Sequence, residues 1–476
     1  MVLNSLRFAL FFLIFLAVLL ILPKKGRKLW LFAGNMLFYL NWEWRGCVLL
    51  LLSSLMIWAC GIFISRSPDQ EQKGRGKVFF LVLPVLWNIG LLVFFKYTGL
   101  IGSLLGRFGI SFPLTASGLL APLGLSFYTL RCISYMADVW RGTIKAVKNP
   151  LDVVIYVSFF PQIISGPIER PGKFFADLAD FGSKSLWNHD ALCRGSLLFT
   201  WGLFQKLVLA ERLSVISARF FGDFTSYGFA ELLLASVAYT LQIYCDFGGY
   251  SDMSRGISGM IGFRSVRNFR QPYLSQGIRN FWRRWHVSLS SWLTDHIYIP
   301  LGGSRRGLLR KYANIILVFL VSGLWHGSTL NFLFWGLLHA FYMILEDLRK
   351  RSRCRYPGWL QWCVTFAEVD LAWIFFNSGG LNRGFRIVRQ MFTHFSPVFP
   401  VDTGLIPGNL AVLAGGLVIL LAVDILHEKG ISVHRRVGSL PLPLRWLICL
   451  GLFWSVIMLG IYGIGYDTSG FIYAQF

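Results

Sequence analysis

Charge is scarce in this sequence, and negative charge is the scarcer kind. Only 14% of the 476 residues are charged, with 23 Asp and Glu against 46 Lys and Arg, whereas 55% are hydrophobic. A soluble core of ordinary proportions cannot hide that much apolar surface, so the composition excludes a typical soluble protein. The chain is therefore expected to be a polytopic membrane protein.

The cysteines form no recognisable pattern. They are scattered, mostly within apolar stretches, and show neither a CxxC pair nor the spacing of zinc ligands. Packing is the expected role of each, and no metal site is predicted. The cysteines are Cys47, Cys60, Cys132, Cys193, Cys245, Cys354, Cys363 and Cys449.

The chain also lacks low-complexity linkers and internal repeats. Residues 1–476 are therefore expected to form a single integral-membrane domain, with a polar block at about 240–345 as its catalytic part. Since no separate soluble domain fits, any enzyme activity has to be built from membrane-embedded residues. A transporter is the non-enzymatic alternative, and the lack of inverted repeats argues against it.

Apolar runs occupy most of the sequence. Several are shorter than the ~20 residues needed to cross about 30 Å of hydrocarbon, so an all-α fold with short, tilted or re-entrant helices around a thin centre is expected. The first run is interpreted as a retained helix, because only Arg7 precedes it and no small-residue cleavage site follows Leu22. The runs are Phe8–Leu22, Leu29–Leu40, Cys47–Ile64, Val78–Phe95, Leu119–Tyr135, Val153–Ile164, Gly195–Leu209, Leu232–Tyr244, Ala313–Leu324, Leu333–Leu345, Trp359–Phe376, Leu410–Val423 and Leu447–Ile461.

Basic residues are clustered in a way that predicts topology. Lysines and arginines follow the first and third apolar runs, so both loops are expected on the cytoplasmic side and the N-terminus outside. The net charge of +23 is attributed mainly to topology and anionic lipid headgroups, and a nucleic-acid role is not expected. A denser group of arginines is an alternative docking site for a phosphorylated donor. Its members are Arg264, Arg267, Arg270, Arg279, Arg283 and Arg284.

Two carboxylates mark the start of the polar block, in the sequence YCDFGGYSD. Asp246 and Asp252 flank Gly248 and Gly249, whose missing side chains allow close backbone approach or a break in a helix. A carboxylate within a membrane has to be paired or solvated. Structural pairing with an arginine such as Arg255 is preferred to direct catalysis, because a structural ion pair perturbs a buried carboxylate just as a functional one does.

His326 is the strongest candidate for a catalytic residue. If the chain is helical from Lys311, it rises about 22 Å before it reaches His326, far from the basic headgroup region. The surrounding sequence SGLWHGSTLN is expected to be the turn or break joining two short helices. A neutral imidazole there can take a proton from a hydroxyl at physiological pH. Nearby Ser322 and Asn331 are expected to be structural or tunnel-lining polar groups.

His286 lies nearer the arginines, in the sequence FWRRWHVSLS. It is expected to orient a donor, to relay a proton, or simply to hydrogen-bond at the interface. The neighbouring Trp282, Trp285 and Trp292 are typical of interfacial anchors. His296 and His339 have weaker context and are expected to be packing or network residues. The candidate donor-binding residues are Arg283, Arg284, Trp285 and Trp282.

The segment 382–392 conflicts with the charge rule, because the predicted topology puts it outside although it is basic. An amphipathic helix in the outer interface accounts for it, with arginines on one face and apolar residues making contact. Such a helix attracts an anionic polymer or a partner protein, or simply anchors to lipid headgroups. The arginines are Arg383, Arg386 and Arg389, and the apolar residues are Phe385, Val388 and Phe392.

The blocks QIYCDFGGYSDMSRGISGMIGF, NFWRRWHVSLSSWLTDHIYIPLGG and SGLWHG together form a specific signature. Through them the chain resembles the membrane-bound O-acyltransferase family, specifically its bacterial alginate O-acetyltransferase branch. The resemblance covers nearly the whole chain. Further matching stretches are Asn4 and Ser5, Phe94–Tyr97, Pro122–Gly142, Phe159–Arg170, Ala372–Phe376 and the terminal FIYAQF, in which Ala474 departs from a frequent aromatic residue.

The resemblance implies a ring of roughly 11 to 13 transmembrane and re-entrant helices around a thin centre with a through-membrane tunnel. It assigns the family's intramembrane histidine to His326 and its second motif histidine to His286. The implied reaction moves an acyl group, acetyl in the first instance, from cytosolic acetyl-CoA to a hydroxyl on the outer side. Acetyl-CoA is then a substrate, and no bound cofactor is expected.

The implied acceptor is an extracytoplasmic polysaccharide or a partner protein that carries the acyl group onward, and the implied location is the bacterial cytoplasmic membrane. The same family includes proteins that transfer D-alanine from a carrier protein to teichoic acid, and the sequence IYIPLGG at Ile297–Gly303 favours the acetyl branch. Direct transfer and a covalent acyl-enzyme both stay open at this point.

Overall fold

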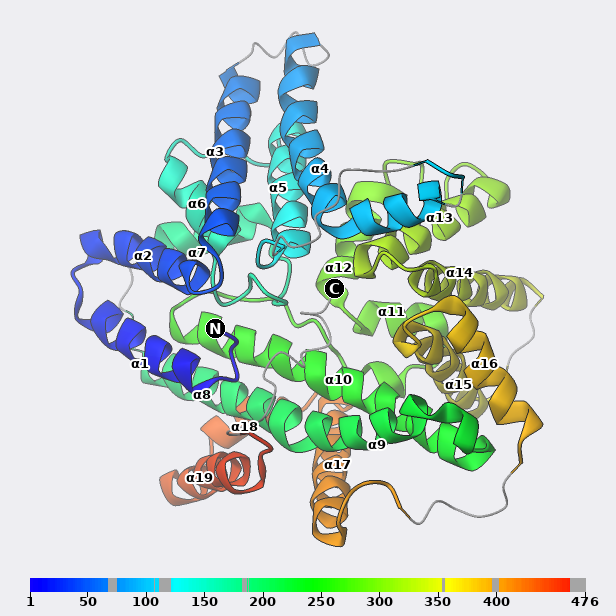
Figure 1. Ribbon diagram of the computed structural model, residues 1–476. Coiled ribbons are helices and arrows are strands. Elements are labelled where there is room, and N and C mark those ends of the chain that lie inside the picture. The colour runs from blue at the N-terminus through cyan, green and yellow to red at the C-terminus, as the bar shows by residue number, and fades with distance from the viewer. Residues whose placement is uncertain are drawn as a thin grey trace. The chain divides into compact units, whose positions relative to one another are not determined.

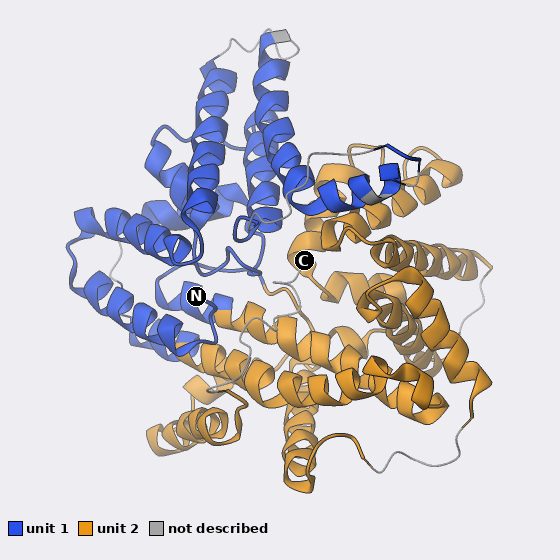
Figure 2. Ribbon diagram, viewed as in Figure 1, with its two compact units in different colours: residues 1–195, 254–266 blue, residues 196–253, 267–476 orange. Residues whose placement is uncertain are grey.

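The computed structural model describes residues 1–66, 75–106, 108–110, 121–181, 186, 188–352, 356–395 and 402–462. Every regular element in these ranges is a helix, which confirms the predicted all-α class (Figure 1). The start of the span Leu119–Tyr135 and the terminal FIYAQF lie outside the described residues. The chain groups into two compact units, residues 1–195 with 254–266 and residues 196–253 with 267–476 (Figure 2). The single domain expected from the sequence stays a prediction.

Aromatic rings fill the interior of the first unit. Phe160 lies with its ring centroid 5.2 Å from that of Phe15 and 5.7 Å from that of Phe38. α3 packs against α4, α5 and α6. The elements are α1 (Leu6–Ile21), η1 (Lys24–Gly26), α2 (Arg27–Leu40), α3 (Trp44–Arg66), α4 (Arg75–Gly106), α5 (Leu125–Trp140), α6 (Pro150–Ser158) and α7 (Pro171–Phe181).

The second unit holds the elements that carry both candidate histidines. α14 packs against both of its neighbours in the chain, α13 and α15, and α16 packs on α15. α8 and α10 contribute residues to both units. The elements are α8 (His189–Leu203), η3 (Phe204–Ala210), α9 (Glu211–Gly222), η4 (Phe224–Ser226), α10 (Phe229–Met260), η5 (Pro272–Leu274), α11 (Ile278–Arg284), α12 (Val287–Leu293), η6 (Thr294–Tyr298), α13 (Leu308–His326), α14 (Leu330–Arg351), α15 (Gly358–Asn377), α16 (Leu381–Thr393), α17 (Pro407–Glu428), α18 (Val433–Gly438) and α19 (Leu442–Leu459).

Each predicted apolar span overlaps a helix, although the boundaries differ. The span Val153–Ile164 is helical only as far as Ser158, because Pro161 lacks the N–H needed to continue a helix and disfavours helical geometry before it. Among the described residues, 5 helices are long and apolar enough to cross a membrane: α3, α4 from Gly76, α13, α17 and α19. The chain is a membrane protein.

α16 confirms the predicted amphipathic helix, and its position at the outer membrane interface stays a prediction. Its buried residues are Gly384, Ile387 and Met391, whereas Phe385 is 48% exposed and Phe392 65% exposed. The cause is the small size of Gly384, where a Cβ would lie 2.7 Å from the ring of Phe375 on α15. The helix therefore packs through its glycine face, which leaves its phenylalanines at the edge of the contact.

Gly249 brings α10 and α8 together at backbone distance. The predicted helix break at Gly248 and Gly249 is wrong, because α10 continues unbroken from Phe229 to Met260. The alternative of close backbone approach is confirmed. A Cβ on Gly249 would lie 2.7 Å from the carbonyl oxygen of Gly202, and a Cβ on Gly202 would lie 2.4 Å from the carbonyl oxygen of Gly249.

Gly249→Ala is therefore expected to destabilise the protein by about 1–3 kcal/mol, because the new methyl group has to push two backbones apart. The matched control is Gly259→Ala on the same helix, where a Cβ meets nothing within 4 Å. The control should be neutral or slightly stabilising, since alanine favours a helix more than glycine does. Thermal unfolding of both variants in detergent tests this, and equal midpoints would contradict the proposed close packing.

Candidate functional site

His326 lies at the tip of a tight helical hairpin. α13 ends at His326, Gly327 follows in an extended conformation, and α14 begins at Leu330. This confirms the predicted break in the sequence SGLWHGSTLN. The two helices approach at backbone distance, since a Cβ on Gly323 would lie 2.4 Å from the carbonyl oxygen of Phe332. The hairpin buries the His326 side chain, which is 2% exposed.

His286 occupies the short connection between α11 and α12. Its φ of 41° puts it in the left-handed region, which a non-glycine residue rarely adopts. The connection pairs with an upstream segment: Arg270 N donates to the Arg284 carbonyl at 2.9 Å, and Val287 N donates to the Asn268 carbonyl at 3.0 Å. The surrounding structure thus holds His286 in a strained backbone conformation, with its side chain only 1% exposed.

The two histidines meet at one tryptophan. The ring centroid of Trp325 lies 6.0 Å from that of His286 and 4.9 Å from that of His326. The ring of Phe247 packs on that of His286, with centroids 4.8 Å apart, and the ring centroid of Phe376 lies 5.4 Å from that of His326. Residues that lie between positions 247 and 376 of the sequence are therefore gathered into one buried aromatic environment. Trp325 was not among the predicted site residues, although it stands in the same SGLWHG motif.

A third histidine continues this cluster. His339 is fully buried, and its ring centroid lies 4.8 Å from Trp335 and 4.9 Å from Trp282. Trp335 in turn lies 5.1 Å from His326. His339 therefore belongs to the ring network next to His326, as its expected network role implies. By contrast, His296 stacks on Trp292 at 4.6 Å and hydrogen-bonds the Trp292 carbonyl, which is a packing arrangement.

The tryptophans of the FWRRWH sequence and its continuation are not all interfacial. Trp285 is 1% exposed and Trp292 is 5% exposed, so the interpretation of these two as membrane-interface anchors is wrong. Trp285 is buried because Phe269 and Trp373 pack on it at 4.8 Å and 5.1 Å. Its role as a donor contact stays a prediction, as does that of Trp282.

The candidate carboxylates are engaged in the interior of the second unit. The Lys206 ammonium lies 2.6 Å from Asp246 and 2.9 Å from Glu211, so Asp246 pairs with a lysine, whereas an arginine was the partner expected from the sequence. Gln205 donates to Asp252 at 3.4 Å. These contacts favour the structural interpretation, in which the buried charge is paired.

Ser322 and Asn331 flank His326 on the two helices of the hairpin. Both are buried, Ser322 at 1% and Asn331 at 0% exposure. The Asn331 side chain donates to the Phe375 carbonyl at 3.1 Å, which ties the start of α14 to the end of α15. Phe376, the next residue, is the one that packs on His326. Asn331 thus supports the His326 environment, and a tunnel role for either residue stays a prediction.

The arginines of the basic group mostly have partners within the protein. Arg264 binds Asp177 in the first unit at 2.6 Å. In the second unit, Arg267 contacts His427, Arg279 contacts Asp347, and Arg284 forms a two-pronged pair with Glu428 at 2.6 Å and 2.9 Å. Arg283, in contrast, is exposed. The two adjacent arginines that were expected to bind a donor together therefore differ in their surroundings: Arg284 is paired with Glu428, whereas Arg283 is exposed.

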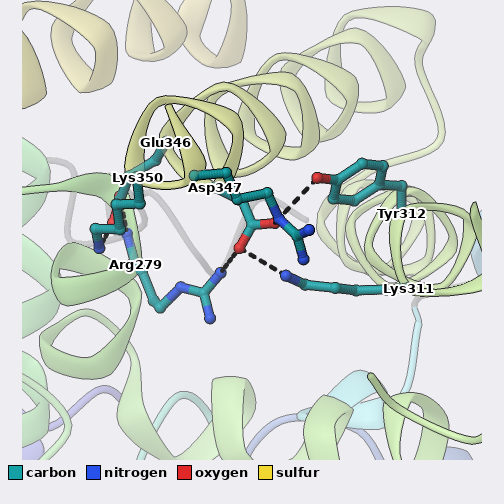
Figure 3. A network of polar contacts seen from close by, with 7 residues as sticks. Arg279, Lys311, Tyr312, Glu346, Asp347 and Lys350 are labelled. Carbon is teal, nitrogen blue, oxygen red and sulfur yellow. Dashed lines mark hydrogen bonds and ion pairs between the residues drawn. The ribbon is translucent and has the colours of Figure 1, made fainter. Parts of the chain in front are cut away.

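Asp347 is a hub that joins three helices (Figure 3). It lies near the end of α14, and its partners Lys311 and Tyr312 lie near the start of α13, so the hub is at the opposite end of the hairpin from His326. Lys311 and Tyr312 from α13 donate to it at 2.6 Å and 3.0 Å, Arg351 donates at 3.1 Å, and Arg279 from α11 donates at 3.4 Å. Burial alone would raise the pKa of Asp347, but the hydrogen bonds from Lys311, Tyr312 and Arg351 outweigh it and lower the pKa to about 2. The carboxylate is thus ionised at any physiological pH, and it anchors α11, which leads to His286, to the hairpin that carries His326.

Comparison with known proteins gives a consistent set of relatives. The model of the membrane-bound O-acyltransferase family matches residues 128–365. The "Probable alginate O-acetylase AlgI" of Pseudomonas aeruginosa is 35% identical over 81% of this chain and 73% of its own length. The "Peptidoglycan O-acetyltransferase" of Helicobacter pylori is 32% identical over 76% of this chain and 73% of its own length. The "Teichoic acid D-alanyltransferase" of Bacillus subtilis is 28% identical over 53% of this chain and 66% of its own length.

Asp347→Asn is expected to lower stability by about 1.5–3 kcal/mol, because the charged acceptor of several hydrogen bonds is lost. Asp402→Asn is the matched control, since it breaks the Arg219–Asp402 pair, whose side chains are 38% and 71% exposed. An exposed pair contributes only ~0–1 kcal/mol. Thermal unfolding in detergent measures both. Equal effects would show that Asp347 is not a structural hub.

Proposed function

The chain belongs to the membrane-bound O-acyltransferase family, and from that premise we propose that it transfers acetyl groups from cytosolic acetyl-CoA to hydroxyls of an extracytoplasmic polysaccharide. The chain is a membrane-bound acyltransferase. One observation carries the assignment of its reaction centre: His286 and His326 contact the same buried ring, that of Trp325. Imidazoles are costly to bury in a membrane protein, and acid–base chemistry gives them a purpose there.

In the proposed reaction His326 is the general base. It takes the proton of the acceptor hydroxyl while the hydroxyl oxygen bonds to the carbonyl carbon of the thioester. The carbon–sulfur bond breaks, and the proton passes to the sulfur, so the products are an ester and a free thiol. Such proton transfer typically contributes roughly 10²- to 10⁴-fold to the rate.

His286, which also contacts the Trp325 ring, assists as a relay or an orienting group for the donor. The rings of Phe247, Phe376, Trp325 and Trp335 surround the two imidazoles, which supports a site that keeps water away from the thioester. We write the reaction as direct transfer, which needs only a base and two bound substrates. A covalent acyl-enzyme would additionally need an activated nucleophile.

The relatives support acetyl over D-alanyl as the transferred group. The two O-acetylating relatives cover 81% and 76% of this chain, whereas the D-alanyltransferase covers 53% at lower identity. The two O-acetylating relatives supply the acceptor classes to test, alginate and peptidoglycan. We further propose that the enzyme lies in a bacterial cytoplasmic membrane with its N-terminus outside, and that a partner protein on the outer side is an alternative first acceptor.

His326→Ala is expected to lose at least 10²-fold in turnover while the protein still inserts and purifies, because removal of a base affects the chemical step more than the packing. His296→Ala is the matched control, since that histidine packs on Trp292 and should leave turnover within a few-fold of wild type. The assay follows labelled acetyl groups from acetyl-CoA to alginate or peptidoglycan glycan in reconstituted vesicles, with a carrier-bound D-alanine arm for the alternative donor. Near wild-type turnover in His326→Ala would refute the assignment.

Arg283→Gln is expected to raise the KM for acetyl-CoA several-fold and to weaken its dependence on salt, with kcat unchanged, because an exposed arginine attracts phosphates through a screened charge. The exposed Arg305→Gln serves as control for loss of one positive charge elsewhere. If Arg283→Gln and Arg305→Gln give the same KM at every salt concentration, Arg283 has only a topological role.

A further inference from the structure

The last turn of α17 holds the segments around His286. This turn lies outside residues 128–365, which the family model matches. We infer that Asp424, His427 and Glu428 act as a positioning clamp that keeps His286 in the backbone conformation in which it meets Trp325. The inference rests on the proposed acyl transfer for its catalytic meaning, but the clamp itself is a property of the fold.

The clamp residues share one face of the helix. Positions 424, 427 and 428 are three and four residues apart, so their side chains point in a common direction. Each one contacts a different part of the polar block. Tyr244 on α10 donates to Asp424 at 2.9 Å and 3.1 Å, and Arg267 donates to Nδ1 of His427 at 3.2 Å.

The third contact is a two-pronged ion pair. Nη1 and Nη2 of Arg284 donate to the two carboxylate oxygens of Glu428 at 2.6 Å and 2.9 Å. This fork-on-carboxylate geometry restrains the orientation of the arginine as well as its position. The same arginine donates through Nε to Asn280 at 3.1 Å, so the end of α11 is fixed from two sides.

The segments that the clamp holds are the strained ones. Within the described residues, the non-glycine residues with positive φ are Gln271, at 47°, and His286, at 41°. Both belong to the pair of segments joined by the Arg270–Arg284 and Val287–Asn268 backbone hydrogen bonds. A residue stays in such a conformation only where its surroundings determine it strongly. α17 holds an arginine at each segment. Arg267 directly precedes the first segment, and Arg284 begins the second.

The restraint is transmitted to His286 through short steps. Arg284 is two residues before His286, and its carbonyl accepts the bond from Arg270. Tyr244, which donates to Asp424, packs on Phe269 at 6.2 Å, and Phe269 packs on Trp285 at 4.8 Å. Loss of the clamp should therefore loosen the loop and misplace the imidazole relative to Trp325, with little effect on the exposed Arg283, the proposed donor contact.

The alternative for Glu428 is competition. A carboxylate that occupies the Arg284 fork would exclude the phosphates of a donor, so its removal should lower the KM for acetyl-CoA. A positioning role predicts the opposite effect on the two constants: removal of Glu428 lowers kcat and leaves KM unchanged. The two roles are thus separated by one variant, Glu428→Gln, which keeps the size of the side chain and removes its charge.

The activity experiment uses Glu428→Gln, Arg284→Glu, Glu428→Arg and the double variant Arg284→Glu/Glu428→Arg, in vesicles with labelled acetyl-CoA. Both single charge reversals and Glu428→Gln should lower kcat roughly 10- to 100-fold, as expected for a small misplacement of a catalytic group, with KM within about twofold of wild type. The double reversal should recover much of the lost kcat. Asp402→Asn, which breaks an exposed ion pair, should leave both constants unchanged.

A second readout does not depend on acyl transfer. His286 is 1% exposed, so its modification by diethyl pyrocarbonate, followed by mass spectrometry of the purified protein, should be slow in wild type and in Asp402→Asn. It should be several-fold faster in Glu428→Gln and Arg284→Glu, and slow again in the double variant. If wild type transfers no acetyl group, the proposed function fails while this readout still tests the clamp. Unchanged His286 reactivity in Glu428→Gln, or a lowered KM with unchanged kcat, would overturn the clamp.

Discussion

The architecture of the candidate site depends on one ring, the indole of Trp325, and its contacts with two imidazoles. The indole of Trp325 lies 6.0 Å from the imidazole of His286 and 4.9 Å from that of His326, measured between ring centroids. Edge-to-face contacts of this kind stabilise buried aromatic groups beyond the area that they bury. The remaining structure serves this meeting point. The α13–α14 hairpin brings His326 to it, and the strained connection before α12 brings His286.

Glycines and charged hubs make these placements possible. Gly323 and Gly336 let α13 and α14 approach at backbone distance, since a Cβ on either would lie within 2.4 Å of a carbonyl oxygen of the other helix. Asp347 then closes the far end of the same hairpin and attaches α11 to it. Both devices set the geometry of the hairpin, and so they help to place the His326 imidazole.

Much of the local structure follows from sequence patterns. Apolar runs predicted the helices, and the glycine-flanked His326 predicted the turn at the hairpin tip, because both signals depend only on neighbouring residues. The same patterns misjudged Gly248 and Gly249, since close approach to another helix and a helix break have the same local signature. They also misjudged Trp285 and Trp292, because burial depends on partners that the local sequence does not reveal.

Long-range polar pairs could not be predicted from the sequence, because their partners are likewise distant along the chain. Arg284 and Glu428 are 144 residues apart, and the charge pattern alone made Arg284 as good a donor ligand as its neighbour Arg283. The partner of Asp246 was sought among arginines, and Lys206 emerged only from the packing of η3 against α10. The positive φ of His286 likewise has no sequence signal, because nothing but tertiary contacts imposes it.

The central claim is that His286 and His326 act as one unit across Trp325. A double-mutant cycle on single-turnover acetyl transfer, with His286→Ala, His326→Ala and the double variant, tests it most directly. Residues that act together give strongly non-additive losses, so the double variant should be about as slow as His326→Ala alone. If the two losses instead multiply, the histidines act independently, and the account of a shared reaction centre is contradicted.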